Sequence, residues 1–433
     1  MTPRSDLFAR LPAFQYRDFR LFWWAQLCVV FGLQMQTIAA NWHVYTLLRD
    51  TASTVTLFGV TFDLNAGALG LGGLGLARWA PLLLFALPGG ALADAVNRRK
   101  LLIATQIVAA LLAGLLALLT FSGRVSVVAI YAVVAGLTAL SAVETPTREA
   151  MLPNLVPRRQ LTNAVSSYVL TMVIATIAGP AVGGVILNTG RIGAVYALHA
   201  VVFLPAIFAL SRLHYGDETY RRGTRVGLTE VMEGFRFTFG QPMIRSTMLM
   251  DFFATLLGSA RTLLPIVADQ VLGIGAGGYG LLATAQPLGN LIAGVTVTVR
   301  RDIVRQGAVF LACVAAYGLG TAAFGLSTVF ALSYVLFAVT GAADTTSSII
   351  RGAIRQFWTP DDLRGRMVGV NMLFYTGGPQ LGEVRAGLVA AVLGAPVAIV
   401  TGGLAAALVA GWVAWQDRRL RDYTSPVTAS VGD

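Results

Sequence analysis

The chain has 433 residues, of which 56% are hydrophobic and only 12% are charged, and its mean hydropathy is +0.69. A soluble protein of this size carries about twice that share of charged residues. The composition excludes a soluble globular protein and a disordered chain, and it predicts a polytopic membrane protein.

The formal net charge of +11 does not indicate a nucleic-acid partner, because nearly all of the 32 basic residues lie between apolar segments, as in membrane proteins. Three dispersed histidines, and two cysteines inside apolar segments, predict no metal site and no cofactor. Lys100 is the only lysine and completes no phosphate-binding loop. Residues 1–20 are polar and basic, and no small-residue cleavage site follows early, so we expect no cleavable signal peptide.

Membrane-spanning helices are the predicted elements, because a helix needs about 20 apolar residues to cross the hydrocarbon core. The strands of a membrane barrel would be shorter and would alternate apolar and polar residues, whereas the residues of these segments are continuously apolar. Twelve segments are long enough, namely 21–47, 68–93, 101–121, 125–146, 161–187, 193–213, 244–268, 278–299, 307–325, 328–350, 366–393 and 397–415.

The basic residues predict the orientation of these spans. With the N-terminus in the cytoplasm, 26 of the 32 basic residues lie on the cytoplasmic side. Only Arg49, Arg124 and Arg191 lie on the other side, and the remaining three, Arg78, Arg261 and Arg385, lie within the spans. This asymmetry predicts that both termini are cytoplasmic.

The longest polar segment divides the chain into halves. The predicted organisation is a six-helix bundle over 1–213, a linker over 214–243, a second six-helix bundle over 244–415 and a cytoplasmic tail over 416–433. The linker is predicted to contain an amphipathic helix at the membrane surface. Its apolar residues recur at helical spacing: Leu228, Val231, Met232, Phe235 and Phe239.

The two halves resemble each other. Arg148 and Arg351 are each followed nine residues later by a proline, and the two arginines are 203 residues apart. Gly179-Pro180 and Gly378-Pro379 lie 199 residues apart. These offsets indicate an internal duplication, which is typical of secondary transporters with a site between repeated halves.

The loop after the second predicted helix carries a candidate gate. Gly90 permits close helix approach, and Asp94, Arg98 and Arg99 can bind helix ends in one conformation and release them in another. The alternative is that the arginines only anchor the cytoplasmic surface. The spacing Gly90-x-x-x-Asp94-x-x-x-Arg98-Arg99 resembles the signature loop of the major facilitator superfamily, although Asn97 stands where that family usually has glycine.

A second motif lies in the fifth predicted helix. Small residues allow tight helix packing, and Pro180 removes one backbone hydrogen bond. The arrangement of Gly179, Pro180 and Gly183 resembles the motif of the exporters of this superfamily. The segments 233–237, 264–269 and 359–366 are similar to the bacterial enterobactin-exporter group. The resemblance implies an all-α fold of twelve transmembrane helices in two pseudo-symmetric bundles, and a monomeric transporter in the inner membrane of a bacterium.

Polar and ionisable residues inside the spans are functional candidates, because a charge at the bilayer centre costs roughly 2.5–3.5 kcal/mol on insertion scales. A proton-coupled exporter needs a carboxyl group that gains and loses a proton as its access to water changes. The candidates for proton coupling or substrate contact are Asp251, Asp344, Glu383, Arg261, Arg385, Glu144, Gln36 and Asn41.

The alternative for Asp251, Asp344 and Glu383 is a static salt bridge between helices or a snorkelling, water-exposed group, and for the two amides it is a hydrogen bond to another helix. Glu144 and Arg148 are spaced for a local pair. Glu383 and Arg385 lie on nearly opposite helix faces and need different partners. Asp251 and Arg261 are expected in one helix, about 15 Å apart, too far to pair.

The predicted function is secondary active transport, as a proton-coupled exporter of an amphipathic small molecule such as a siderophore or a drug. An importer or a lipid flippase of the same fold is the alternative. A membrane enzyme is less favoured, because no clustered catalytic residues occur, and a non-transporting sensor is a further alternative.

Overall fold

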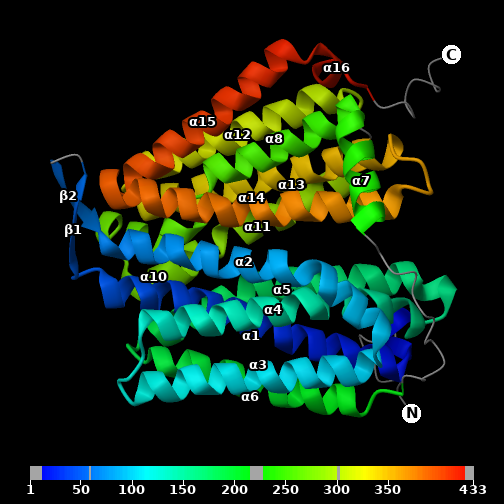
Figure 1. Cartoon of the computed structure of the whole chain (residues 1–433), viewed down its shortest axis with the longest axis horizontal. Helices are drawn as coiled ribbons and strands as arrows, with labels where there is room; N and C mark the ends of the chain where they lie inside the picture. Colours follow the sequence, from blue (N-terminus) through cyan, green and yellow to red (C-terminus); the bar gives the residue numbers. More distant parts are fainter. Residues whose placement is uncertain (1–11, 58–59, 215–227, 300–302, 425–433) are drawn as a thin grey trace, which may run out of the picture. The chain divides into compact units, whose positions relative to one another are not determined.

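The computed structural model describes residues 12–57, 60–214, 228–299 and 303–424 (Figure 1). The first half is helical apart from one hairpin. Its long helices are α1 (Arg17–Leu48), α2 (Ala66–Ala95), α3 (Arg98–Phe121), α4 (Val127–Met151), α5 (Leu161–Leu187) and α6 (Ile192–Ser211), with short turns η2 (Pro12–Gln15), η3 (Leu152–Asn154) and η4 (Arg158–Gln160).

The hairpin lies between α1 and α2. Strands β1 (Ala52–Leu57) and β2 (Val60–Asn65) pair antiparallel, with Ala52 opposite Asn65. The side chain of Asn65 accepts a hydrogen bond from the backbone N–H of Ala68 at 3.0 Å. This bond satisfies one of the free donors at the start of α2, so the hairpin leads directly into that helix.

The second half contains shorter and interrupted helices. The first are α7 (Leu228–Gly240), α8 (Pro242–Gly258), η6 (Arg261–Leu263), α9 (Leu264–Ile266), η7 (Val267–Val271), α10 (Gly275–Leu282) and α11 (Ala285–Val299). They are followed by α12 (Gln306–Leu326), α13 (Phe330–Phe357), α14 (Arg364–Leu393), α15 (Ala395–Gln416) and α16 (Arg418–Arg421). Helix α7 lies in the segment where the spacing predicts one.

Ten segments of the described chain are long and apolar enough to cross a membrane. The other two predicted spans form α13 and α14, with 28 and 30 residues. Both are long enough to span, but both contain ionisable side chains, including Asp344 and Glu383. Apart from the β1–β2 hairpin, the predicted helical membrane fold is therefore confirmed, and the count of twelve spans stays a prediction.

Two segments predicted as continuous helices, 244–268 and 278–299, are interrupted in the structure. The first breaks after Gly258, and the second breaks between α10 and α11. A proline follows each break, Pro265 in the first and Pro287 in the second. Pro287 lacks the N–H that would bond to the Ala283 carbonyl, which lies in the second break, and Pro265 lacks the N–H that would bond to the Arg261 carbonyl, which follows the first break. Both segments remain long and apolar enough to cross a membrane, so only the continuity of their helices was predicted wrongly.

The chain forms two compact units. One unit comprises residues 1–43 and 80–225, and the other comprises residues 44–79 and 226–433. In the first unit, α3 packs against α4 and α6. In the second, α12 packs against α13 and α15, and α8 packs against α14 and α15.

The core of the second unit is closely packed. A Cβ atom added at Gly318 of α12 would lie 2.6 Å from both the Ala407 nitrogen and the Gly403 oxygen of α15. The two helix backbones therefore touch, as small residues permit in membrane helices. A buried apolar cluster lies beside this contact, formed by Met250, Ala254, Phe310, Leu311, Val314, Ile350, Ile354, Ala410 and Leu420.

Candidate functional site

A buried group of charges connects α8 to α13. We call Asp251, Asp344, Arg351 and Arg355 the α8–α13 charge cluster. Arg351 Nη1 lies 2.9 Å from Asp251 Oδ1 and 3.6 Å from Asp344 Oδ1. The side chains of Arg351 and Asp251 are only 4% and 3% exposed, whereas that of Asp344 is 37% exposed. One guanidinium group thus holds a buried carboxylate and a more accessible one.

Arg355 extends the cluster to a third helix. Its Nε donates to Thr247 Oγ1 of α8 at 3.2 Å, and its Nη2 donates to the Thr247 carbonyl at 2.9 Å. Its Nη1 donates to Asn371 Oδ1 of α14. Because two carboxylates and two guanidinium groups lie together, the four formal charges sum to zero.

The first unit carries a related arrangement around Arg148 of α4. Arg148 Nη1 donates to Gln26 Oε1 of α1 at 3.1 Å and lies 3.5 Å from Glu144 Oε2. The local pair predicted from the spacing of Glu144 and Arg148 is therefore present. Arg148 and Arg351 occupy matching positions of the repeated halves, and each reaches the first helix of its half. In the first half this helix is α1, which provides the neutral amide of Gln26. In the second half it is α8, which provides the carboxylate of Asp251.

A second ionic contact in the second unit lies nearer the hairpin. Arg78 Nη1 of α2 lies 2.9 Å from Glu383 Oε2 of α14, and the two side chains are 14% and 12% exposed. The backbones touch one turn away, because a Cβ atom at Gly387 would lie 2.7 Å from the Ala68 carbonyl and from the Gly72 nitrogen. Glu383 is thereby clamped against α2.

Asp269 forms a further contact at this end. Tyr45 Oη donates to Asp269 Oδ2 at 2.7 Å, and Arg49 Nη1 donates to the same oxygen at 3.2 Å. These bonds join the last turn of α1 to the π-helical turn η7. We call the Arg78–Glu383 pair and the two Asp269 bonds the hairpin-end links.

Arg261 and Arg385 do not pair with Asp251. Arg261 lies beyond the break, in η6, with an exposed side chain within electrostatic range of Glu383 and Arg78. Arg385 points toward Gly402 of α15. Its Nε and Nη2 are buried and have no hydrogen-bond partner among the described residues. Glu383 and Arg385 thus face different helices, as their spacing predicts.

The arginines of the candidate gate bind helix ends within the first unit. Arg98 Nη1 donates to the Ala150 carbonyl near the end of α4 at 3.3 Å. Arg99 donates from Nε to the Leu210 carbonyl at 2.9 Å, near the end of α6. Asn97 accepts a hydrogen bond from the Lys100 backbone and caps α3, which gives a structural role to the residue that replaces the usual glycine. The surroundings of Gly90 and the side chain of Asp94 lie outside the described part of the structure.

The glycines of the fifth predicted helix pack on α1. A Cβ atom at Gly179 would lie 2.7 Å from Gln34 Cβ, and one at Gly183 would lie 3.5 Å from Met35 Cα. Pro180 is buried within α5. The motif therefore permits close packing of α1 and α5.

The two amide candidates of α1 are buried. Gln36 is 1% exposed and its Oε1 is hydrogen-bonded to His199 Nδ1 of α6. For Gln36 the structure therefore selects a contact with another helix. Asn41 is 4% exposed.

Sequence reasoning missed four residues that hold these networks together. Arg351 was used as a marker of the repeat, where it matches Arg148, and was otherwise counted, like Arg355, only among the cytoplasmic charges. Arg78 was recognised as lying within a span but not treated as a candidate. Asp269 ends the segment 264–269 that resembles the enterobactin-exporter group, but it was not treated as a candidate because it lies just beyond the predicted span 244–268.

Comparison with known proteins agrees with this architecture. The family model of the transmembrane secretion effectors matches residues 9–431. The enterobactin exporter EntS of Escherichia coli O1:K1 is 28% identical over 289 residues, covering 65% of this chain and 68% of the relative. The EntS protein of Escherichia coli O157:H7 strain EC4115 is 28% identical over 291 residues, with the same shares covered.

Solved structures show the same fold at low identity. A POT family transporter in complex with 5-aminolevulinic acid has a TM-score of 0.71 at 10% identity, covering 94% of this chain and 97% of that one. A bacterial homologue of the iron transporter ferroportin, in an inward-facing state, also has a TM-score of 0.71, at 14% identity and with 93% and 99% covered. The chain belongs to the transmembrane secretion effector family of the major facilitator superfamily of transporters.

Proposed function

We propose that this transporter is a proton-coupled exporter of an amphipathic small molecule, acting by alternating access between two six-helix bundles. The observation that carries the proposal is the α8–α13 charge cluster, in which Arg351 contacts both a buried and an accessible carboxylate. The proposed cargo class, a siderophore or a lipophilic drug, is supported by the enterobactin exporters among the relatives.

The cluster suits proton coupling because its charge balance changes with one proton. Asp251 Oδ2 is buried and accepts no hydrogen bond among the described residues, so it is the free position for a proton. Protonation of Asp251 leaves Arg351 with Asp344 alone and gives the cluster a net positive charge. An uncompensated charge in the membrane interior is costly, so the protonated cluster favours a conformation in which water reaches it.

The hairpin-end links are the proposed outer gate. With the N-terminus in the cytoplasm, the hairpin lies on the outer side of the inner membrane, and the links join α1 and α2 to the second-half elements η7 and α14. Release of cargo to the outside requires these bonds to break. In the same orientation, with the N-terminus in the cytoplasm, the loop with Asp94, Arg98 and Arg99 lies on the cytoplasmic side, and we propose that it is the cytoplasmic gate.

Transport in inside-out membrane vesicles tests the proposal. An imposed gradient with an acidic lumen should drive accumulation of a catechol siderophore or of a lipophilic cationic dye. Asp251→Asn should abolish the dependence on the gradient. The matched control is Asp361→Asn, which removes a carboxylate from a surface pair whose side chains are 55% and 88% exposed, and it should transport normally.

The outcomes separate the alternatives. Gradient-driven accumulation that survives Asp251→Asn keeps export and moves coupling to Asp344 or Glu383. Uptake only in right-side-out vesicles identifies an importer and refutes the proposed direction. Accumulation of neither compound in either orientation refutes the proposed cargo class.

A further inference from the structure

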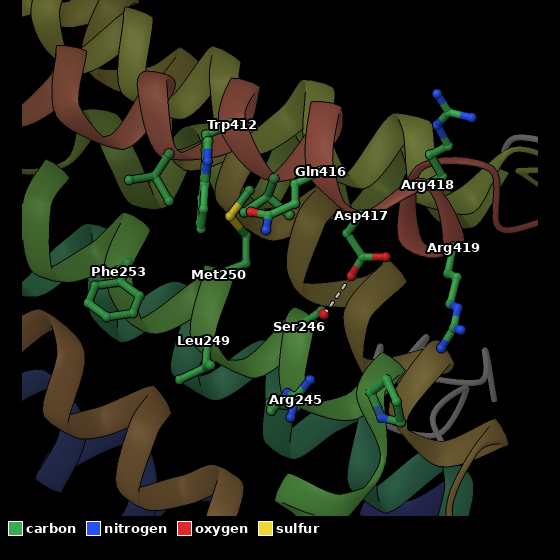
Figure 2. A pocket seen from close by; sticks show the side chains of 13 residues that line it. Arg245, Ser246, Leu249, Met250, Phe253, Trp412, Gln416, Asp417, Arg418 and Arg419 are labelled. Carbon is green, nitrogen blue, oxygen red and sulfur yellow. Dashed lines mark hydrogen bonds between the residues drawn. The ribbon is translucent and has the colours of Figure 1, made fainter.

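A groove in the second unit lies apart from the charge networks described above. It has a volume of about 590 Å³ and lies between α8 and α15, with α16 at one end (Figure 2). This volume falls within the range of small-molecule pockets.

The walls of the groove are apolar and open to the surroundings. Phe253 of α8 is 42% exposed and Trp412 of α15 is 58% exposed. Leu249 and Val409 complete these walls. Phe253 lies eight residues beyond Arg245 in the sequence, which is about 12 Å along a helix. The groove is thus long enough to hold part of an extended hydrocarbon chain.

One end of the groove is cationic. Arg245, Arg418 and Arg419 line it with exposed side chains. In the described part of the chain, none of these three guanidinium groups forms a hydrogen bond or an ion pair within 4 Å. The acidic residue of the lining, Asp417, is already engaged, because it accepts bonds from Ser246 Oγ at 2.7 Å and from the Leu420 N–H at 3.1 Å. Figure 2 shows the Ser246–Asp417 bond between the apolar walls and two of the arginines, Arg418 and Arg419, with Arg245 next to Ser246.

We propose that this groove binds an anionic phospholipid, with its phosphate at the three arginines and an acyl chain along Leu249, Phe253 and Trp412. Basic pockets between membrane helices on the cytoplasmic side bind anionic head groups, and tryptophan is favoured at the level of the head groups. The charge of the ligand and its amphipathic shape both match the lining. None of the lining residues belongs to the α8–α13 charge cluster or to the hairpin-end links, so the test of this site does not depend on cargo or coupling.

Trp412 provides a direct probe of the acyl chain. The full-length protein is reconstituted into nanodiscs of phosphatidylcholine containing phosphatidylglycerol brominated on its acyl chains, and tryptophan quenching is measured. Subtracting the signal of Trp412→Phe isolates the contribution of Trp412. We expect half-maximal quenching at roughly tenfold lower mole fraction for brominated phosphatidylglycerol than for brominated phosphatidylcholine.

Charge-matched variants test the arginines. The triple variant Arg245→Gln, Arg418→Gln and Arg419→Gln should lose the preference for phosphatidylglycerol. A control triple, Arg20→Gln, Arg158→Gln and Arg159→Gln, removes the same charge from exposed positions of the first unit and should keep the preference. Thermal unfolding of each variant verifies that it remains folded.

Three results would overturn the proposal. Equal quenching by the two lipids would mean that the groove selects no head group. If both triple variants lost the preference for phosphatidylglycerol equally, the preference would come from the overall charge of the protein and not from this groove. Movement of labelled phosphatidylglycerol across proteoliposome membranes, abolished by the groove variant, would make the groove a transport entrance instead of a resident lipid site.

Discussion

Replacing Asp251 by asparagine should destabilise the protein far more than removing a carboxylate from its surface. Asp251 and Arg351 are 2.9 Å apart, and their side chains are 3% and 4% exposed. Removing one partner of such a buried pair costs about 3–5 kcal/mol. We expect the lower part of that range, because Asp344 remains 3.6 Å from the same guanidinium nitrogen.

Asp361→Asn is the matched control. Asp361 and Arg364 are also 2.9 Å apart, but their side chains are 88% and 55% exposed. Water already solvates both charges, so an exposed pair contributes only about 0–1 kcal/mol. The two substitutions therefore break contacts of equal length and should differ by about 2 kcal/mol or more in the free energy of unfolding.

The assay is reversible unfolding of purified protein in mixed micelles, followed by tryptophan fluorescence. The double variant Asp251→Asn with Arg351→Gln should lose less stability than the sum of the single variants, because no buried charge of the pair is then left without its partner. Equal losses for Asp251→Asn and Asp361→Asn would refute the buried pair as a strong link. Strict additivity in the double variant would refute the coupling of the two groups.

Three further results are expected. Glu383→Gln weakens the charged hydrogen bond with Arg78, and such a bond contributes about 1.5–3 kcal/mol. A cysteine introduced near Arg78 should therefore be labelled faster by a reagent added on the hairpin side, and an unchanged rate would refute an outer gate. Gly387→Ala should lower the free energy of unfolding by about 1–3 kcal/mol, because the added methyl group would overlap the backbone of α2. The control is Gly369→Ala in the same helix, where a methyl group meets nothing within 4 Å, and it should be neutral or stabilising. Equal effects of the two substitutions would contradict the close packing. Tyr317→Phe should cost about 1 kcal/mol, because its hydroxyl donates at 3.1 Å to the last carbonyl of α8; no loss would show that water replaces the bond at the break.

Much of the fold could be predicted because membrane burial acts on each segment separately. Every spanning backbone must satisfy its own hydrogen bonds, so long apolar segments predict helices without any knowledge of their neighbours. The helix breaks after Gly258 and between α10 and α11 were missed because they depend on the neighbours of the segment and not on the segment alone. Prolines are also accommodated inside continuous helices here, as at Pro180 in α5, so whether a proline interrupts a helix depends on its neighbours.

The sequence predicted which residues of the candidate site are important, but it predicted only some of their interaction partners. Glu144 was paired correctly with Arg148, because an i, i+4 pair is a local property of one helix. The partners of Asp251 and Glu383 lie on other helices, at Arg351 and Arg78. Their distances along the chain gave no indication of these contacts.

The sequence by itself therefore determined the class of the protein, its helical spans and the set of costly polar residues within them, since each follows from composition and local spacing. The tertiary structure alone decided how the charges combine. It placed the accessible Asp344 and the buried Asp251 on one guanidinium group, and it directed Gln36 to His199. Ion pairs and hydrogen bonds act over a few ångströms, so helix packing, and not position along the chain, determines which groups meet.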